Sequence, residues 1–203
     1  MTPRDRVLAR LAAAIAARDR AVLEKAIDCA KEAADQKAVE EVLLQSYLFV
    51  GFPLALEAVA LWRERSGFAA PEDSQEDAAS WRNRGEAVCQ TVYGGQYGRL
   101  RQNIALLHPA YERWMVEEGY GKVLGRPELS LRTRELCVVA QLAALGMPRQ
   151  LYSHMRGARH AGAEDSEIEA ALEEAAAVSS AENARNARSV WKSIALRAPG
   201  GAG

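Results

Sequence analysis

The segment from residue 129 to residue 158 decides the fold, and it reads LSLRTRELCVVAQLAALGMPRQLYSHMRGA. An apolar run over residues 136–146 leads into the triplet Gly146-Met-Pro148. Such a triplet ends one helix and begins the next, because proline is favoured at the first position of a helix. We therefore expect two helices that form an antiparallel hairpin and turn at residues 146–148.

The same helical pattern extends outward over most of the chain. Near the start, apolar residues recur at the i, i+3, i+4 and i+7 spacing of one helix face; they are Leu8, Leu11, Ala12 and Ile15. A second break is expected at Gly51-Phe-Pro53, and residues 67–75 (GFAAPEDSQ) are typical of a linker. No sustained alternation of apolar and polar residues predicts a strand. The expected fold class is all-α.

An internal repeat organises these helices. At an offset of 128, Arg4-Asp-Arg-Val-Leu8 aligns with Arg132-Thr-Arg-Glu-Leu136. After one inserted residue the offset becomes 129, and Glu40 and Trp62 align with Glu169 and Trp191. The prediction is two tandem helical repeats, 1–66 and 130–197, joined by a helical segment over 79–127. As domains, these give an N-terminal structural repeat (1–66) and a unit over 79–197 that carries the site.

Charge and hydropathy exclude several classes of protein. The 203 residues hold 26 Lys+Arg and 27 Asp+Glu, a formal net charge of −1. A dedicated nucleic-acid-binding protein would carry a basic surplus. The longest apolar stretches, 47–56 and 136–146, are shorter than the roughly 20 residues of a membrane span. Neither a nucleic acid nor a membrane is therefore an expected partner.

The cysteines and histidines limit the chemistry further. Cys29, Cys89 and Cys137 are scattered and form no CxxC pair. They predict neither a disulfide framework nor a zinc site, and they fit the reducing cytoplasm. His154 and His160 are six residues apart and face different ways on a helix, so no metal site is expected.

Glu135 and His154 are the candidate catalytic pair. Glu135 lies eleven residues before Gly146, and His154 lies eight after it. On an antiparallel hairpin the corresponding rises are about 16 and 12 Å, which place both side chains at a similar depth. A carboxylate beside an imidazole can transfer protons. The alternative is an exposed Glu135 that favours the start of its helix, with His154 as a hydrogen-bonded core residue.

Several arginines lie near the same hairpin. Guanidinium groups suit carboxylate ligands, so the candidate substrate-binding residues are Arg126, Arg134 and Arg149. Tyr93, in the glycine-rich run Tyr-Gly-Gly-Gln-Tyr-Gly98, could line the mouth of a pocket. The alternative for the arginines is a solvated face that forms surface ion pairs.

These segments resemble the carboxymuconolactone decarboxylase family. The resemblance is carried by residues 129–146, 151–158 and 161–162, with support from 85–94, 121–127 and 39–60. It implies the alkylhydroperoxidase D-like helical fold and a homo-oligomer, typically a trimer or hexamer. The family reaction removes CO2 from a carboxymuconolactone without a cofactor. The implied roles are His154 as proton donor, Glu135 as the residue that orients it, and a small carboxylate or lactone as ligand.

The same superfamily contains thiol peroxidases, whose motif aligns here without a gap. Glu135 and His154 occupy its first and last positions, but Met147 and Gln150 stand at the two cysteine positions and Arg149 at the intervening histidine. A disulfide-cycling peroxidase needs both thiols, so this activity is the disfavoured alternative. A non-catalytic oligomeric binding or scaffold protein is the other. The first repeat carries Val7 and Ala26 at the matching positions and offers no second site.

Overall fold

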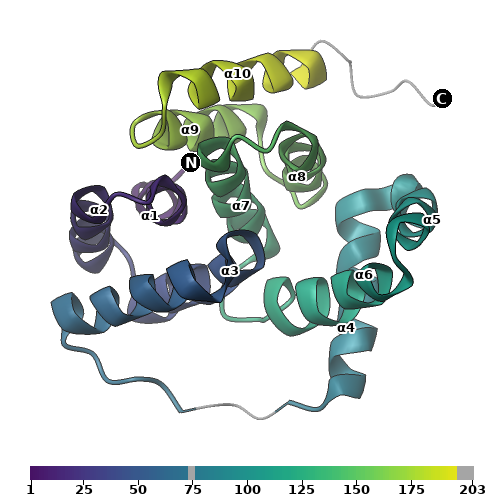
Figure 1. Cartoon of the computed structure of the whole chain (residues 1–203), viewed down its shortest axis with the longest axis horizontal. Coiled ribbons are helices and arrows are strands. Elements are labelled where there is room, and N and C mark those ends of the chain that lie inside the picture. Colours follow the sequence, from purple (N-terminus) through teal and green to yellow (C-terminus); the bar gives the residue numbers. More distant parts are fainter. Residues whose placement is uncertain (73–75, 196–203) are drawn as a thin grey trace.

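The structure, a computed structural model, describes residues 1–72 and 76–195. Helices and short connections account for this part of the chain, which contains no strand. The all-α prediction is therefore confirmed. Helices α1 (Pro3–Ala17) and α7 (Leu131–Leu145) lie side by side at the centre (Figure 1), and both are buried along most of their length.

The first three helices begin at side-chain caps. Thr2 caps α1, Asp19 caps α2 (Arg20–Ala33), and Asp35 caps α3 (Gln36–Ser66); each side chain accepts a hydrogen bond from a backbone N–H of the first turn. Gly51 interrupts α3 with φ 76° and ψ 166°, a conformation that a residue with a Cβ atom rarely adopts. The predicted break at Gly51-Phe-Pro53 is thus confirmed as a kink.

Helix α3 is long and apolar enough to cross a membrane by length and composition alone, and it is the one such helix among the described residues. The kink at Gly51 divides it into two shorter pieces. Its inward face is part of the protein core, where Val39, Val42, Leu43 and Trp62 are almost fully buried. Core helices of this kind pass the same length and composition criterion.

The middle of the chain forms a helical layer on the right of the molecule in Figure 1. Its elements are α4 (Ala78–Tyr93), the 3-10 turn η1 (Gly94–Gln96), α5 (Tyr97–Leu107), α6 (Pro109–Trp114) and the π-helix η2 (Met115–Leu124). A Cβ at Gly85 would lie 2.0 Å from the carbonyl oxygen of Val116, and one at Gly121 the same distance from that of Trp81. The backbones of α4 and η2 are therefore in direct contact.

The predicted hairpin is confirmed. Helix α7 ends at Gly146, whose φ of 69° is left-handed, and α8 (Pro148–His160) starts two residues later. Helices α9 (Asp165–Ala176) and α10 (Ala181–Ala195) follow and lie over α7 and α8 at the top of Figure 1. Helix α7 and the inward face of α8 are thus covered by other helices, and this hairpin positions the candidate pair.

Two contacts recur at the offsets of the sequence repeat. The indole nitrogen of Trp62 donates to Glu40, and that of Trp191 donates to Glu169. Across the centre, Arg6 donates to Glu174, and the matching Arg134 donates to Gln45. The division into units 1–66 and 79–197 stays a prediction, and residues 196–197, like 73–75 of the expected linker, lie outside the described residues.

Candidate functional site

Glu135 and His154 meet inside the α7–α8 hairpin. Glu135 Oε2 lies 2.8 Å from His154 Nδ1, and the exposed fractions of the two residues are 0% and 8%. A carboxylate oxygen only accepts, so the ring nitrogen donates whenever the carboxyl is ionised. The alternative in which Glu135 is an exposed residue of the first turn is wrong. The other oxygen, Oε1, is buried and has no hydrogen-bond partner among the described residues.

Gly157 on α8 makes room for this pair. A Cβ atom there would lie 3.0 Å from Glu135 Oε2 and 2.7 Å from Val92 Cγ1. Any larger residue would push the Glu135 carboxylate away from α8. Sequence reasoning treated Gly157 only as part of a motif, because a close approach between helices leaves no periodic signal.

The second ring nitrogen of His154, Nε2, forms no hydrogen bond with another described residue. The imidazole lies edge-on to Phe49 of α3, with the ring centres 5.8 Å apart and an interplanar angle of 82°. The Nδ1 contact fixes one tautomer, in which Nε2 carries the free electron pair. The geometry therefore leaves Nε2 as the nitrogen available for proton transfer.

Two tyrosine hydroxyls lie close to the pair. Tyr93 and Tyr120 share a hydrogen bond of 2.6 Å, with their rings edge-to-face. Burial raises the pKa of both hydroxyls, and the negative charge of Glu135 raises it further. Both tyrosines therefore stay protonated at neutral pH and act as donors. Tyr93 was predicted as a pocket residue, whereas Tyr120 was missed because it lies in the π-helix η2.

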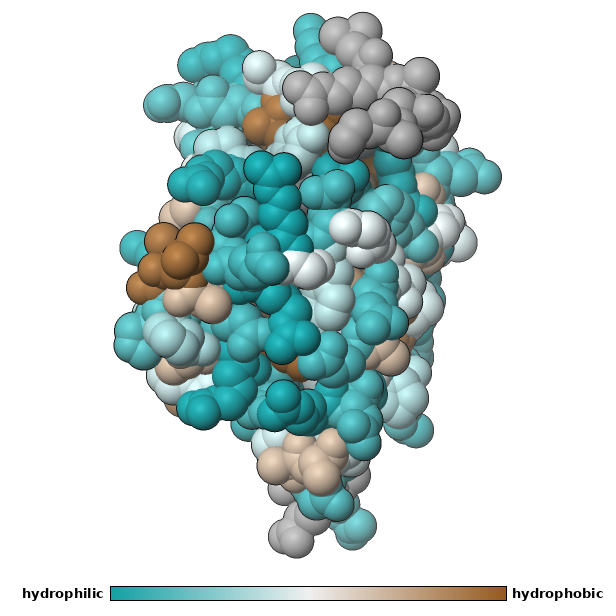
Figure 2. Space-filling model, turned by 90° about the vertical axis from the view of Figure 1, so that its right-hand side faces the viewer, coloured by the Kyte–Doolittle hydropathy of each residue, from teal (hydrophilic) through white to brown (hydrophobic). Residues whose placement is uncertain are grey.

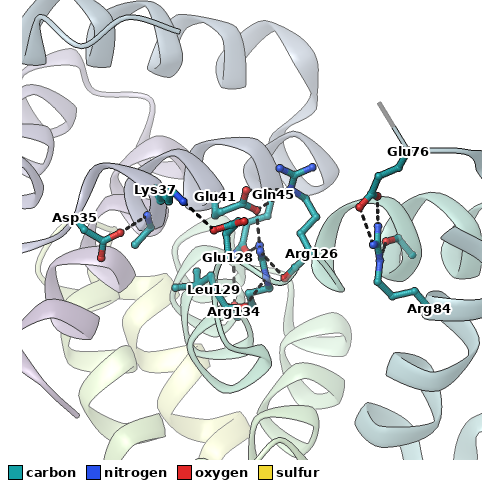
Figure 3. A network of polar contacts seen from close by, with 12 residues as sticks. Asp35, Lys37, Glu41, Gln45, Glu76, Arg84, Arg126, Glu128, Leu129 and Arg134 are labelled. Carbon is teal, nitrogen blue, oxygen red and sulfur yellow. Dashed lines mark hydrogen bonds and ion pairs between the residues drawn. The ribbon is translucent and has the colours of Figure 1, made fainter. Parts of the chain in front are cut away.

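The structure places two of the predicted arginines in a different cluster. Arg126 and Arg134 both contact the carboxylate of Glu41, at 3.0 and 2.7 Å (Figure 3). Arg134 is fully buried and also donates to Gln45 and to the backbone of Leu129 and Arg126. Burial lowers the pKa of Arg134, and the contact with Glu41 opposes this shift. This cluster joins α3 to α7.

Arg149 lies apart from both groups, at the exposed first turn of α8. The structure therefore brings together Glu135, His154 and Tyr93 from the predicted set, and it does not bring the three arginines to them. Their roles as substrate ligands stay predictions.

A hollow with a volume of about 260 Å3 opens between α4, α5 and α8. Its polar lining comes from eight residues: Tyr93, Gln96, Arg99, Asn103, Tyr152, Ser153, Arg156 and His160. Neither Glu135 nor His154 lines it, but Tyr93 and Val92 lie both at its wall and beside Glu135. Sequence reasoning missed Arg99 and the place of His160, because three separate helices form this hollow.

The cysteines lie in surroundings that suppress thiol chemistry. Cys89 and Cys137 are fully buried, and burial raises the pKa of Cys89 to about 12 and that of Cys137 further still. Met147 and Gln150 stand exposed where a redox pair would be. In residues 1–72 and 76–195, no group of three or more His, Cys, Asp or Glu could hold a metal ion.

Fold and site together define an all-α protein built around a buried carboxylate–imidazole pair. Residues 109–193, which include both members of the pair, match the model of the carboxymuconolactone decarboxylase family. No curated protein matches the chain.

Proposed function

We propose that the protein is a lyase that removes CO2 from a small carboxylated lactone or a similar ring acid without a cofactor. The observation that carries the proposal is the buried 2.8 Å contact between Glu135 and His154. The family match supports it, because the matched residues include both side chains.

The chemistry follows from the states of the two groups. When the bond to the carboxyl group breaks, its electron pair passes into the adjacent unsaturated carbonyl of the ring. A proton must then reach the ring. We propose that His154 first takes up a proton from solvent at Nε2, which makes the imidazole an imidazolium, and then delivers that proton to the substrate. Glu135 holds the imidazole in one tautomer and stabilises its protonated form, since within the described residues the ring is the one ion-pair partner of this buried carboxylate.

Turnover of carboxymuconolactone, followed as CO2 release, tests the proposal. His154→Gln should lower kcat by about 10²–10⁴-fold, the usual contribution of a positioned proton donor. The matched control is His108→Gln, which changes an exposed histidine at the start of α6. Wild-type turnover in H154Q, with the fold intact by circular dichroism, would remove His154 from the reaction.

Glu135→Gln separates positioning from general disruption. The amide keeps the shape of the side chain and loses its charge, so the imidazolium is no longer stabilised. We expect kcat to fall while the melting temperature stays near that of the wild type. A fall in kcat that is matched by a large fall in melting temperature would point to a structural role only.

The thiol-peroxidase alternative finds no support in the positions of the cysteines. A dithiol-coupled hydroperoxide assay checks it directly, and activity that depends on Cys89 or Cys137 would favour it. Absence of turnover with every carboxylated lactone, and of any ligand-induced stabilisation, would favour a non-catalytic scaffold instead.

We also propose a homo-oligomer, a trimer or hexamer, located in the cytoplasm. Figure 2 shows a compact hydrophobic patch on the otherwise mainly hydrophilic face of the α4–α6 layer. Leu106 and Leu107, at the end of α5, are 86% and 81% exposed. Exposed apolar residues that adjoin one another favour burial against another chain. Sedimentation equilibrium measures the number of chains, and a monomer at all concentrations would contradict the assembly.

A further inference from the structure

The hollow between α4, α5 and α8 has the lining of an anion site. Two arginines and a histidine line it, Arg99 from α5 and Arg156 and His160 from α8, together with neutral side chains. No aspartate or glutamate is among its lining residues. A concave surface with this lining concentrates positive potential and attracts anions.

The arginines of the hollow differ from their neighbours on the same helices. On α5, Arg101 forms ion pairs with Glu86 and Glu112. On α8, Arg159 is paired with Asp165 at 2.7 Å. Each helix thus carries one arginine that is held by carboxylates outside the hollow.

Within the described residues, by contrast, Arg99 and Arg156 form no ion pair. The guanidinium of Arg156 lies 6.0 Å from the ring centre of Tyr152, a contact that leaves its N–H groups free of carboxylates. Two guanidinium groups that line the same hollow without carboxylate partners suit a ligand that brings its own carboxylate.

The remaining groups are of the kind that fix a small ligand in place. Asn103 and Ser153 offer neutral donors and acceptors. His160 Nδ1 lies 2.7 Å from the carbonyl oxygen of Val92, which only accepts, so Nδ1 donates and Nε2 is the nitrogen left for a ligand. A volume of about 260 Å3 fits a small ring acid, near the lower end of small-molecule sites.

We propose that this hollow binds a small organic anion through its carboxylate, with Arg99 and Arg156 as the residues that bind it. Val92 lines the hollow, and its side chain and the Glu135 carboxylate both lie against Gly157, so the wall of the hollow adjoins the candidate pair. That the ligand is the substrate rests on the proposed function. The anion site itself does not, because neither Glu135 nor His154 lines it.

Isothermal titration calorimetry with phthalate tests the site, and neutral phthalamide provides the uncharged comparison. Phthalate should bind to the wild-type protein, and phthalamide should not. Arg99→Gln and Arg156→Gln should each weaken phthalate binding by about tenfold or more, since each removes a charge-assisted hydrogen bond. The matched control is Arg188→Gln, which removes the same charge from an exposed position on α10 and should leave the affinity unchanged.

Three outcomes would overturn the proposal: phthalate bound no better than phthalamide, equal affinity in all three arginine variants, or sulfate binding as tightly as phthalate. Thermal melts of the variants check that they fold. H154Q keeps the two tests apart, because it should bind phthalate like the wild type. Normal turnover in H154Q would thus contradict the role of His154 without contradicting the anion site. Loss of phthalate specificity would contradict the anion site without contradicting the role of His154.

Discussion

The two predicted repeats, residues 1–66 and 130–197, have contacts in common at matching positions and differ at the positions of the candidate pair. The tryptophan–glutamate contact and the arginine that crosses the centre occur in both halves. Where the second half has Glu135 and His154, the first has Val7 and Ala26 at the matching positions. The contacts that build the fold are therefore separate from the groups that could carry chemistry, and only the second half has both.

The largest expected difference concerns the matching arginines of the two halves. Arg134 is fully buried and Arg6 is 42% exposed at its side chain. Arg134→Gln should lower the free energy of unfolding by roughly 3–5 kcal/mol, as the loss of one partner of a buried ion pair does. Arg6→Gln should cost less than about 1 kcal/mol, because Arg10 still pairs with Glu174. Urea denaturation measures both.

Equal losses in R134Q and R6Q would show that burial does not distinguish the two arginines. Unchanged urea m-values in both variants serve as the check that the unfolding transition stays comparable.

A smaller difference in stability is expected between alanine substitutions at Gly157 and at the matching Cys29. Alanine normally stabilises a helix relative to glycine, by about 1 kcal/mol. At position 157 the added Cβ would press on Val92 and Glu135, so Gly157→Ala should instead destabilise the protein by about 1–3 kcal/mol. Cys29→Ala, on a half-buried position of α2, should change stability by less than about 1 kcal/mol. Thermal denaturation gives both values, and a G157A protein more stable than the wild type would contradict the packing described around Glu135.

The smallest effect concerns acid stability, through Glu167 and its counterpart Ala38. Arg132 lowers the pKa of Glu167 from 4.5 to about 2. As pH falls, the unfolded chain binds the proton first, so the stabilisation is complete above pH 4.5 and is lost towards pH 2. The contribution of this ion pair to the free energy of unfolding is at most about 3 kcal/mol. Partial exposure of Arg132 to solvent reduces this contribution.

Glu167→Gln should therefore lower stability at pH 7 and flatten its decline between pH 4.5 and pH 2. Urea denaturation at a series of pH values shows this slope. Glu182→Gln, at an exposed position of α10, should leave the slope as it is. A slope unchanged by E167Q would mean that this ion pair does not contribute to acid sensitivity.

The sequence predicted what depends on spacing along one hairpin. Counting residues on either side of Gly146 placed Glu135 and His154 at similar depth, and the structure brings them into contact. The sequence did not predict that Arg134 forms an ion pair with Glu41. These residues are 93 positions apart and meet only when α3 packs on α7. The sequence also did not predict the positively charged lining of the hollow, with Arg99, because that lining forms only when separate helices pack together.

The contact between Gly85 and Gly121 has a consequence for how the molecule opens. Two backbones that touch without intervening side chains exclude water, and neither α4 nor η2 can loosen without exposing the other. The amides of both should exchange with deuterium as one cooperative unit. The wall of the hollow thus keeps its shape until that whole layer unfolds.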